Sequence, residues 1–134
     1  MSIKGLRKAT LALATMAMAG GIAVTGAGSA SASVGGGCAG PDYQKVCISD
    51  GWTQVNTSVT TNFASSNCTE QVIIWDYTTN TQAISTSFPC HSGQYTFTWA
   101  LANPTAGHDY KAEARFYWQP GSGYTYQTSP DLHF

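Results

Sequence analysis

The stretch from Gly107 to Trp118 reads Gly-His-Asp-Tyr-Lys-Ala-Glu-Ala-Arg-Phe-Tyr-Trp, and its pattern decides the fold class. From position 110 onward every even position is apolar, and positions 111, 113 and 115 are charged. This alternation predicts a β-strand with one buried and one solvent-facing side, whereas a helix would place its apolar residues three and four apart. We expect the buried side to carry Tyr110, Ala112, Ala114, Phe116 and Trp118, opposite Lys111, Glu113 and Arg115.

Other segments of the chain show the same alternation or a short, continuous apolar run. Turn-forming Gly, Pro, Asn and Asp residues separate them, and none has the period of a helix. The sequence therefore predicts an all-β fold, a single antiparallel β-sandwich of about seven strands, with a small barrel as the alternative. Besides 107–118, the expected strands are Val46–Ile48, Trp52–Phe63, Thr69–Tyr77, Gln82–Phe88, Gln94–Leu101 and Tyr124–Thr128.

The first 32 residues have the three parts of a secretory signal peptide. Lys4, Arg7 and Lys8 precede the uncharged, apolar stretch 9–28, and Ala30-Ser31-Ala32 fits an A-x-A cleavage site. A membrane anchor is the alternative, but the apolar stretch is mostly Ala, Gly and Thr and is weakly hydrophobic. Its composition resembles the leaders of secreted actinobacterial proteins. We therefore expect a signal peptide at 1–32 and a secreted, extracellular domain at 33–134.

The expected mature domain has 102 residues, which suits one domain. We expect 33–40 to be a mobile lead-in and 129–134 an extended tail. The mature chain keeps three basic and seven acidic side chains, a net charge of −4. A weakly acidic domain without a basic patch argues against nucleic acid and anionic membranes as partners. We expect a monomer.

Tyr110 stands where the expected strand 107–118 opens, two residues before the small Ala112. This arrangement resembles the tyrosine corner of immunoglobulin-like and fibronectin-type β-sandwiches. The resemblance implies an immunoglobulin-like sandwich in which the Tyr110 ring is buried and its hydroxyl bonds to the backbone of the 103–108 loop. The cysteines do not bracket a Trp at the spacing of antibody domains, so the resemblance implies an architecture and no function.

The four cysteines of a short secreted chain predict two disulfides, with three possible pairings. We favour Cys38 with Cys47 and Cys68 with Cys90, because the second pair would flank two consecutive antiparallel strands at the same end. A metal site formed by cysteines and His91 is disfavoured, since no C-x-x-C spacing is present. We expect no metal and no other cofactor.

The histidines lie in separate segments, at His91, His108 and His133. An adjacent pair such as His108-Asp109 is more often a loop feature than part of a catalytic triad, and no G-x-S-x-G motif supplies a nucleophile. The sequence therefore predicts no catalytic residues and a protein that is not an enzyme.

The surplus of aromatic residues is the feature that points toward a function. The alternation leaves Tyr117 on the outward side of its strand, and Tyr124 and Tyr126 share one face of the next. Exposed rings suit stacking on sugars or anchoring a protein, although cross-strand Tyr pairs also serve stability alone. We predict a non-catalytic extracellular binding module for a polysaccharide or protein, with these three tyrosines as binding residues.

Two other functions remain as alternatives. The first is a secreted inhibitor of a hydrolase, a protease or an α-amylase. The chain is similar to the α-amylase inhibitors in size, cysteine count and an aromatic residue after a cysteine, but Trp52-Thr53-Gln54 stands in place of their Trp-Arg-Tyr triplet. The second alternative is a small secreted hydrolase.

Overall fold

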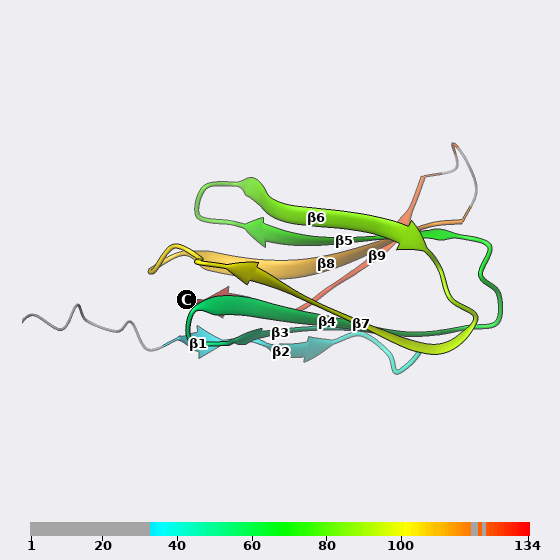
Figure 1. The fold of residues 1–134 in the computed structure, drawn as a ribbon, viewed down its shortest axis with the longest axis horizontal. Helices are drawn as coiled ribbons and strands as arrows, with labels where there is room; N and C mark the ends of the chain where they lie inside the picture. Colours follow the sequence, from blue (N-terminus) through cyan, green and yellow to red (C-terminus); the bar gives the residue numbers. More distant parts are fainter. Residues whose placement is uncertain (1–32, 119–120, 122) are drawn as a thin grey trace, which may run out of the picture.

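The computed structural model describes residues 33–118, 121 and 123–134, so the expected signal peptide lies outside the described residues. Ten strands form two antiparallel sheets that lie face to face (Figure 1). The predicted all-β sandwich with two disulfides is confirmed. The described part of the chain contains no helix with the length and hydropathy needed to cross a membrane.

Sheet A has six strands in the order β1-β10-β8-β5-β6, with β9 also paired to β8. β8 is its centre: β5 lies along one side, and β10 and β9 follow one another along the other side. The bounds are β1 Val34–Gly35, β5 Thr69–Asp76, β6 Thr81–Pro89, β8 Asp109–Tyr117, β9 Thr125–Thr128 and β10 Leu132–His133.

Sheet B has four strands in the order β2-β3-β4-β7. Its bounds are β2 Gly37–Ala39, β3 Gln44–Asp50, β4 Gln54–Phe63 and β7 Gly93–Ala102. The expected mobile lead-in is a wrong prediction: β1 pairs with β10, and β2 pairs with β3. Short pairings of this kind are too brief to show a period in the sequence.

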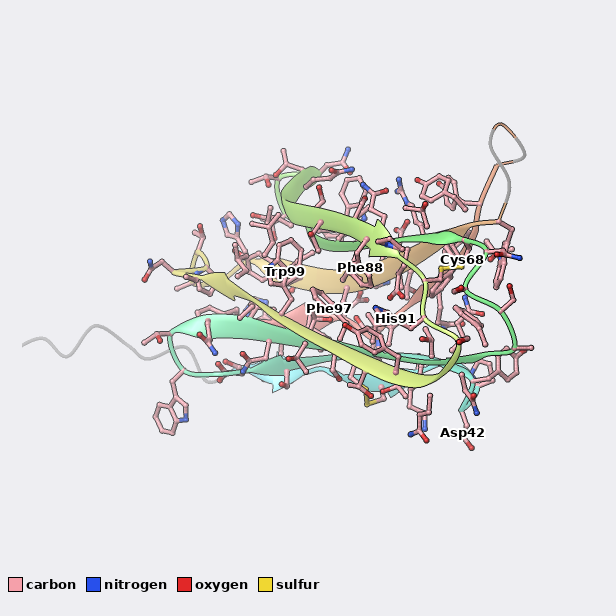
Figure 2. The ribbon with its side chains drawn as sticks, turned by 45° about the vertical axis from the view of Figure 1, so that its right-hand side comes forward. Asp42, Cys68, Phe88, His91, Phe97 and Trp99 are labelled. Carbon is pink, nitrogen blue, oxygen red and sulfur yellow. A yellow bond between two sulfur atoms is a disulfide. The ribbon has the colours of Figure 1, made fainter. Side chains whose placement is uncertain are left out.

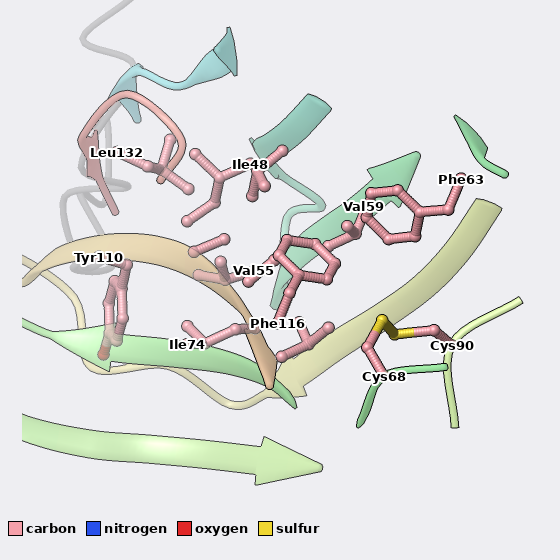
Figure 3. Packing of buried hydrophobic residues seen from close by; sticks show 14 residues of the cluster. Ile48, Val55, Val59, Phe63, Cys68, Ile74, Cys90, Tyr110, Phe116 and Leu132 are labelled. Carbon is pink, nitrogen blue, oxygen red and sulfur yellow. A yellow bond between two sulfur atoms is a disulfide. The ribbon is translucent and has the colours of Figure 1, made fainter. Parts of the chain in front are cut away.

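The core lies between the sheets and follows the predicted alternation of β8 (Figure 3). Tyr110, Ala112, Ala114 and Phe116 are at most 2% exposed. The prediction fails for Trp118, which is 40% exposed because β8 ends one residue earlier. The other core side chains include Val46, Ile48, Val55, Val59, Phe63, Val72, Ile74 and Leu132.

Each sheet ends in a long strand that lacks charged side chains: β6 is an edge of sheet A, and β7 is an edge of sheet B. The sequence from 77 to 108 contains no Asp, Glu, Lys or Arg. The ring centroids of Phe88 in β6 and Phe97 in β7 lie 4.6 Å apart between the sheets. Figure 2 shows both rings together with Trp99. The inward side chains of β7 are only half-buried, because an edge strand has a neighbour on one side alone.

Thr57 and Thr61 share the buried face of β4 with Val55 and Val59, as the alternation predicts. The Thr57 hydroxyl donates a hydrogen bond to the Cys47 carbonyl at 2.8 Å. The Thr61 hydroxyl has no such partner among the described residues, although burying an unpaired hydroxyl is costly.

The two disulfides have the predicted pairing. Cys38–Cys47 joins opposite residues of β2 and β3. Cys68–Cys90 closes one end of the β5–β6 pair inside the core, where the Cys90 N–H also donates to the Cys68 carbonyl at 2.9 Å (Figure 3).

We expect Tyr110→Phe to lower the free energy of unfolding by about 1–3 kcal/mol, the loss typical of a buried hydrogen bond. The Tyr110 side chain is 2% exposed, and its hydroxyl accepts a hydrogen bond from the Thr105 N–H at 2.9 Å. Chemical denaturation of both proteins measures the loss. Tyr43→Phe is the matched control, because the Tyr43 ring is 58% exposed. A loss of only a few tenths of a kcal/mol for Tyr110→Phe would mean that this bond does not brace the 103–108 loop.

Candidate functional site

The outward face of sheet A gathers aromatic side chains from β5, β8 and the segment around β9. The strand register places Gln71, Arg115 and Tyr126 side by side across the three strands. Because side chains alternate along a strand, residues at odd positions of β5 and β8 share this face. We call this surface the tyrosine face and define it by Gln71, Trp75, Arg115, Tyr117, Tyr124 and Tyr126.

The three tyrosines predicted as binding residues lie in one cluster. The ring centroids of Tyr117 and Tyr124 are 5.2 Å apart with planes inclined by 49°, and those of Tyr124 and Tyr126 are 6.2 Å apart at 61°. Tyr124 is 45% and Tyr126 63% exposed. Tyr117 is half-buried and its hydroxyl donates to the Gln71 side-chain carbonyl at 3.0 Å. The cluster thus combines fixed and solvent-exposed rings.

Arg115 holds the centre of the tyrosine face. Its guanidinium lies 4.7 Å from the Tyr124 ring centroid and 5.8 Å from that of Trp75. It is ion-paired with Glu113, whose other carboxylate oxygen accepts a hydrogen bond from the Trp75 indole at 3.1 Å. Burial acts to lower the pKa of Arg115, but the hydrogen bonds with Glu113 and Tyr117 and the nearby charge of Glu113 together outweigh it, so the pKa is raised. The cation is therefore permanent, and its position is set by two rings and a carboxylate.

The outward side chains of β8 are less exposed to solvent than the alternation predicts. Glu113 is 8% exposed, and Arg115 is half-buried. Ile73 also points outward, opposite Glu113, and yet has no exposed surface. The side chains of this face therefore cover Ile73 and form a thin second layer outside the core. The single-strand pattern could not show this cover, because Trp75 and the β9 segment supply much of it.

A hollow of about 390 Å³ adjoins the tyrosine face beside Tyr117. Trp118 forms another part of its wall, with its ring edge-on to Phe63 at 5.0 Å and its indole N–H donating to Thr125 at 3.2 Å. The rest of the lining is mostly polar and comprises Ser66, Asn67, Cys68, Thr69 and Gly121. A ligand lying over the rings would therefore find hydrogen-bonding groups at its side.

The opposite face of the molecule carries a second concave surface, which the sequence analysis missed. It is a trough of about 670 Å³ on the outward side of sheet B. We call it the polar trough; its lining includes Ser49, Gln54, Asn56, Ser58, Thr98 and Ala100. The signal for it was present in the sequence, since small polar residues occupy the even positions of β4.

Trp52 lies in the β3–β4 hairpin loop, two residues before Gln54 of the polar trough. It was predicted as a strand residue, but β4 begins at Gln54, and the Trp52 side chain is 93% exposed. Its φ is 70°, a left-handed conformation that is uncommon for a bulky residue. The Trp52 N–H donates to the Asp50 carboxylate at 2.7 Å, which holds the turn. The Asp50-Gly51 turn signal could have indicated an exposed ring here.

The histidines do not form a catalytic arrangement with one another. His108 pairs with Asp76 at 2.7 Å, and the adjacent Asp109 pairs instead with His133 at 2.8 Å. His91 stacks on Tyr95 with centroids 3.7 Å apart. In the described ranges, no three His, Cys, Asp or Glu side chains come together as metal ligands.

Glu70 has the perturbed pKa that often marks a functional acid. Burial raises the pKa of its carboxyl to about 7. The side chain is, however, 1% exposed and lies on the core side of β5, between Phe88 and Phe116 of the neighbouring strands. No substrate can reach a group enclosed in this way, so we assign Glu70 to the interior and not to a site.

Comparisons with known proteins leave the family open. No protein-family model and no curated protein matches the chain. Among solved structures, the chain is similar to a protein from Bacteroides fragilis provisionally assigned as a β-galactosidase, with 16% identity and a TM-score of 0.42. The match covers 71% of this chain and 15% of the length of that protein. A likeness at this level supports no inference about fold or function.

Proposed function

We propose that the chain is a small secreted, non-catalytic binding module for an extracellular polysaccharide. Its ligand contacts the tyrosine face at Tyr124 and Tyr126, next to Tyr117. The observation that carries the proposal is the gathering of these three rings into one exposed cluster around a fixed arginine, beside a polar hollow. Rings that remain 45% and 63% exposed recover only part of the free energy of burial, so stability alone does not account for them.

The chemistry of the face suits a sugar chain. A sugar ring has an apolar C–H face that stacks on an aromatic ring and polar hydroxyls at its rim that bond to neighbouring side chains. The tyrosine rings are inclined to one another by 49° and 61°, so they do not form one flat platform. A single twisted chain can present successive sugars at such angles, whereas a flat crystalline surface cannot. The proposed ligand is therefore a soluble, single polysaccharide chain.

The way in which the ionisable groups are used supports binding without catalysis. A hydrolase needs an acid or nucleophile and a base that reach one substrate. Here Glu113 is engaged by Arg115 and Trp75, Asp76 by His108, and Glu70 is enclosed in the core. These partners favour a structural role for each group.

Secretion and the immunoglobulin-like resemblance belong to the same proposal. Two disulfides in a domain of this size are typical of extracellular proteins. The bond between the Tyr110 hydroxyl and the Thr105 N–H supports the resemblance to a tyrosine corner. The proposed module acts as a monomer.

We expect Tyr124→Ala/Tyr126→Ala to weaken binding to the polysaccharide about tenfold or more, as loss of central aromatic contacts does. Affinity electrophoresis through gels containing starch, arabinoxylan, β-glucan or mannan identifies the polysaccharide that binds, and calorimetry then compares the variants. The melting temperature should remain near that of the wild type, because both rings are largely exposed.

Tyr43→Ala is the matched control, since Tyr43 is an exposed ring in the turn before β3 and is not part of the tyrosine face. It should bind as the wild type does. Equal losses in the two variants, or no loss in either, would refute the tyrosine face as the site. If the wild type binds none of these polysaccharides, the polysaccharide proposal is wrong and a protein ligand replaces it.

A further inference from the structure

The polar trough and the hairpin beside it have features that the proposed function does not use. The trough lies on sheet B, on the opposite side of the sandwich from the tyrosine face. Its volume of about 670 Å³ falls within the roughly 300–1,000 Å³ typical of small-ligand sites. It is therefore large enough to be a site in its own right.

The lining of the trough is uncharged. Its outward side chains are hydroxyls, amides, a methyl group and the disulfide-bonded Cys47. Phosphates, metal ions and other charged ligands would find no countercharge in such a lining, because desolvating a charge is costly unless it is paired. A ligand rich in neutral hydroxyls fits best, since hydroxyl and amide groups can both donate and accept hydrogen bonds.

Two amides stand together at one end of the trough. The Gln54 side-chain N–H donates to the Asn56 side-chain carbonyl at 2.6 Å. The Gln54 carbonyl oxygen and the Asn56 amide nitrogen take no part in that bond. The pair thus combines an acceptor and a donor on adjacent outward positions of β4, an arrangement that suits neighbouring hydroxyls of one sugar.

Trp52 lies in the hairpin loop two residues before Gln54 of the lining and carries a large exposed ring. Its side chain is 93% exposed, more than any other large hydrophobic side chain that the structure describes. Three hydrogen bonds hold the loop. The Asp50 carboxylate accepts from the Trp52 N–H. The Gly51 N–H donates to the Gln54 carbonyl at 2.8 Å, and the Asn103 N–H donates to the Thr53 carbonyl at 3.0 Å. A strained backbone that presents an exposed indole contributes little to stability and is typical of a binding position.

We infer that the polar trough, with Trp52 and the Gln54–Asn56 amide pair, is a second binding site for a neutral sugar chain. The indole stacks on the apolar face of one sugar, and the amides bind its hydroxyls. Because this site and the tyrosine face lie on opposite sides of the sandwich, one module can hold two chains and link them. The proposal of this second site does not depend on the tyrosine face being a binding site.

The experiment uses Tyr124→Ala/Tyr126→Ala as the parent, so that only the trough is left to bind. Calorimetry with soluble starch, arabinoxylan, β-glucan and mannan should show residual binding to at least one of them. Adding Trp52→Gly should weaken it about tenfold or more, and Asn56→Ala should weaken it as well. Glycine at position 52 also relieves the left-handed backbone, so the fold should not be weakened.

Thr60→Ala is the matched control, because Thr60 lies on the same outward face of β4 but outside the trough lining. It should bind as the parent does. Bridging of two polysaccharide chains is measured as turbidity when the protein is mixed with the polysaccharide that it binds. Here each set of substitutions is made alone in the wild-type chain. The wild type should cause turbidity, and Trp52→Gly or Tyr124→Ala/Tyr126→Ala alone should remove it.

The outcomes separate the two sites. The trough is overturned as a sugar site if the parent binds none of the four polysaccharides. It is also overturned if neither Trp52→Gly nor Asn56→Ala weakens the binding of the parent. Inhibition of a hydrolase that depends on Trp52, in a chain that binds no polysaccharide, also overturns it. If Tyr124→Ala/Tyr126→Ala binds as tightly as the wild type while Trp52→Gly abolishes binding, the trough is supported and the tyrosine face is wrong.

Discussion

Replacing Glu70 with glutamine should raise the free energy of unfolding by up to about 3 kcal/mol at pH 8 and change it far less at pH 4. The Glu70 carboxyl has an ordinary pKa of 4.5 in the unfolded chain and about 7 in the folded one, where burial disfavours its charged form. Each unit between the two pKa values corresponds to about 1.4 kcal/mol. The folded protein must therefore carry a costly buried charge at pH 8.

The direction of the effect follows from proton binding. Between pH 4.5 and 7 the folded state holds a proton on Glu70 that the unfolded state has released, so stability falls as the pH rises through this window. Below pH 4.5 both states are protonated, and above pH 7 both are ionised, so the contribution is constant there. Glu70→Gln removes the titration, and the difference in stability between variant and wild type should grow across the window and then level off.

Denaturant unfolding at several pH values from 4 to 8 measures this difference. Asp42→Asn is a suitable control, because the hydrogen bond from Lys45 holds the pKa of Asp42 below its usual value and outside the window. It should leave the pH dependence between 4.5 and 7 unchanged. A Glu70→Gln variant whose stability runs parallel to the wild type over that range would show that the carboxyl is not desolvated.

Removing the Cys68–Cys90 disulfide by changing both residues to alanine should lower the free energy of unfolding by about 3 kcal/mol or more. The bond spans 22 positions of sequence, and closing a loop of that length restricts the unfolded chain by about 3 kcal/mol. Cys68 and Cys90 are also 9% and 3% exposed within the core, so the loss of their sulfur atoms leaves a cavity. Denaturation under identical conditions gives the difference.

The Cys38–Cys47 pair provides the comparison within the same chain. It spans 9 positions and lies outside the core cluster, so its removal should cost about 2.5 kcal/mol with little added cavity cost. Removal of Cys68–Cys90 should therefore lower the free energy of unfolding more than removal of Cys38–Cys47. A larger loss for the Cys38 and Cys47 double variant would mean that the β5–β6 end tolerates opening better than its burial indicates.

The fold could be predicted because burial in a sheet has a period of two. That rule located Tyr110 and Phe116 on the inside of β8, and the run at Val72–Ile74 in a strand with neighbours on both sides. It could not locate β1, β2 and β10, because pairings of two or three residues contain less than two periods of the pattern. It also could not distinguish the edge strand β7 from an enclosed one.

The candidate site could be predicted only in part. Tyr117, Tyr124 and Tyr126 were selected by parity alone, and the register of β8 and β9 then places them together. Arg115 was expected to be a solvated charge. Its packing between two rings depends on Trp75, a residue forty positions away in sequence that no local pattern connects to it.

The role of β10 sets the time at which this protein can fold. Leu132 is 1% exposed in the core, and β10 is the strand that joins β1 to the rest of sheet A. Sheet A therefore cannot close on a growing chain until its last strand has left the ribosome, and β8 must wait for a partner more than twenty residues downstream. Pairings between segments this far apart in sequence form slowly, because the loop between them must close first, so the closing of sheet A is expected late in folding.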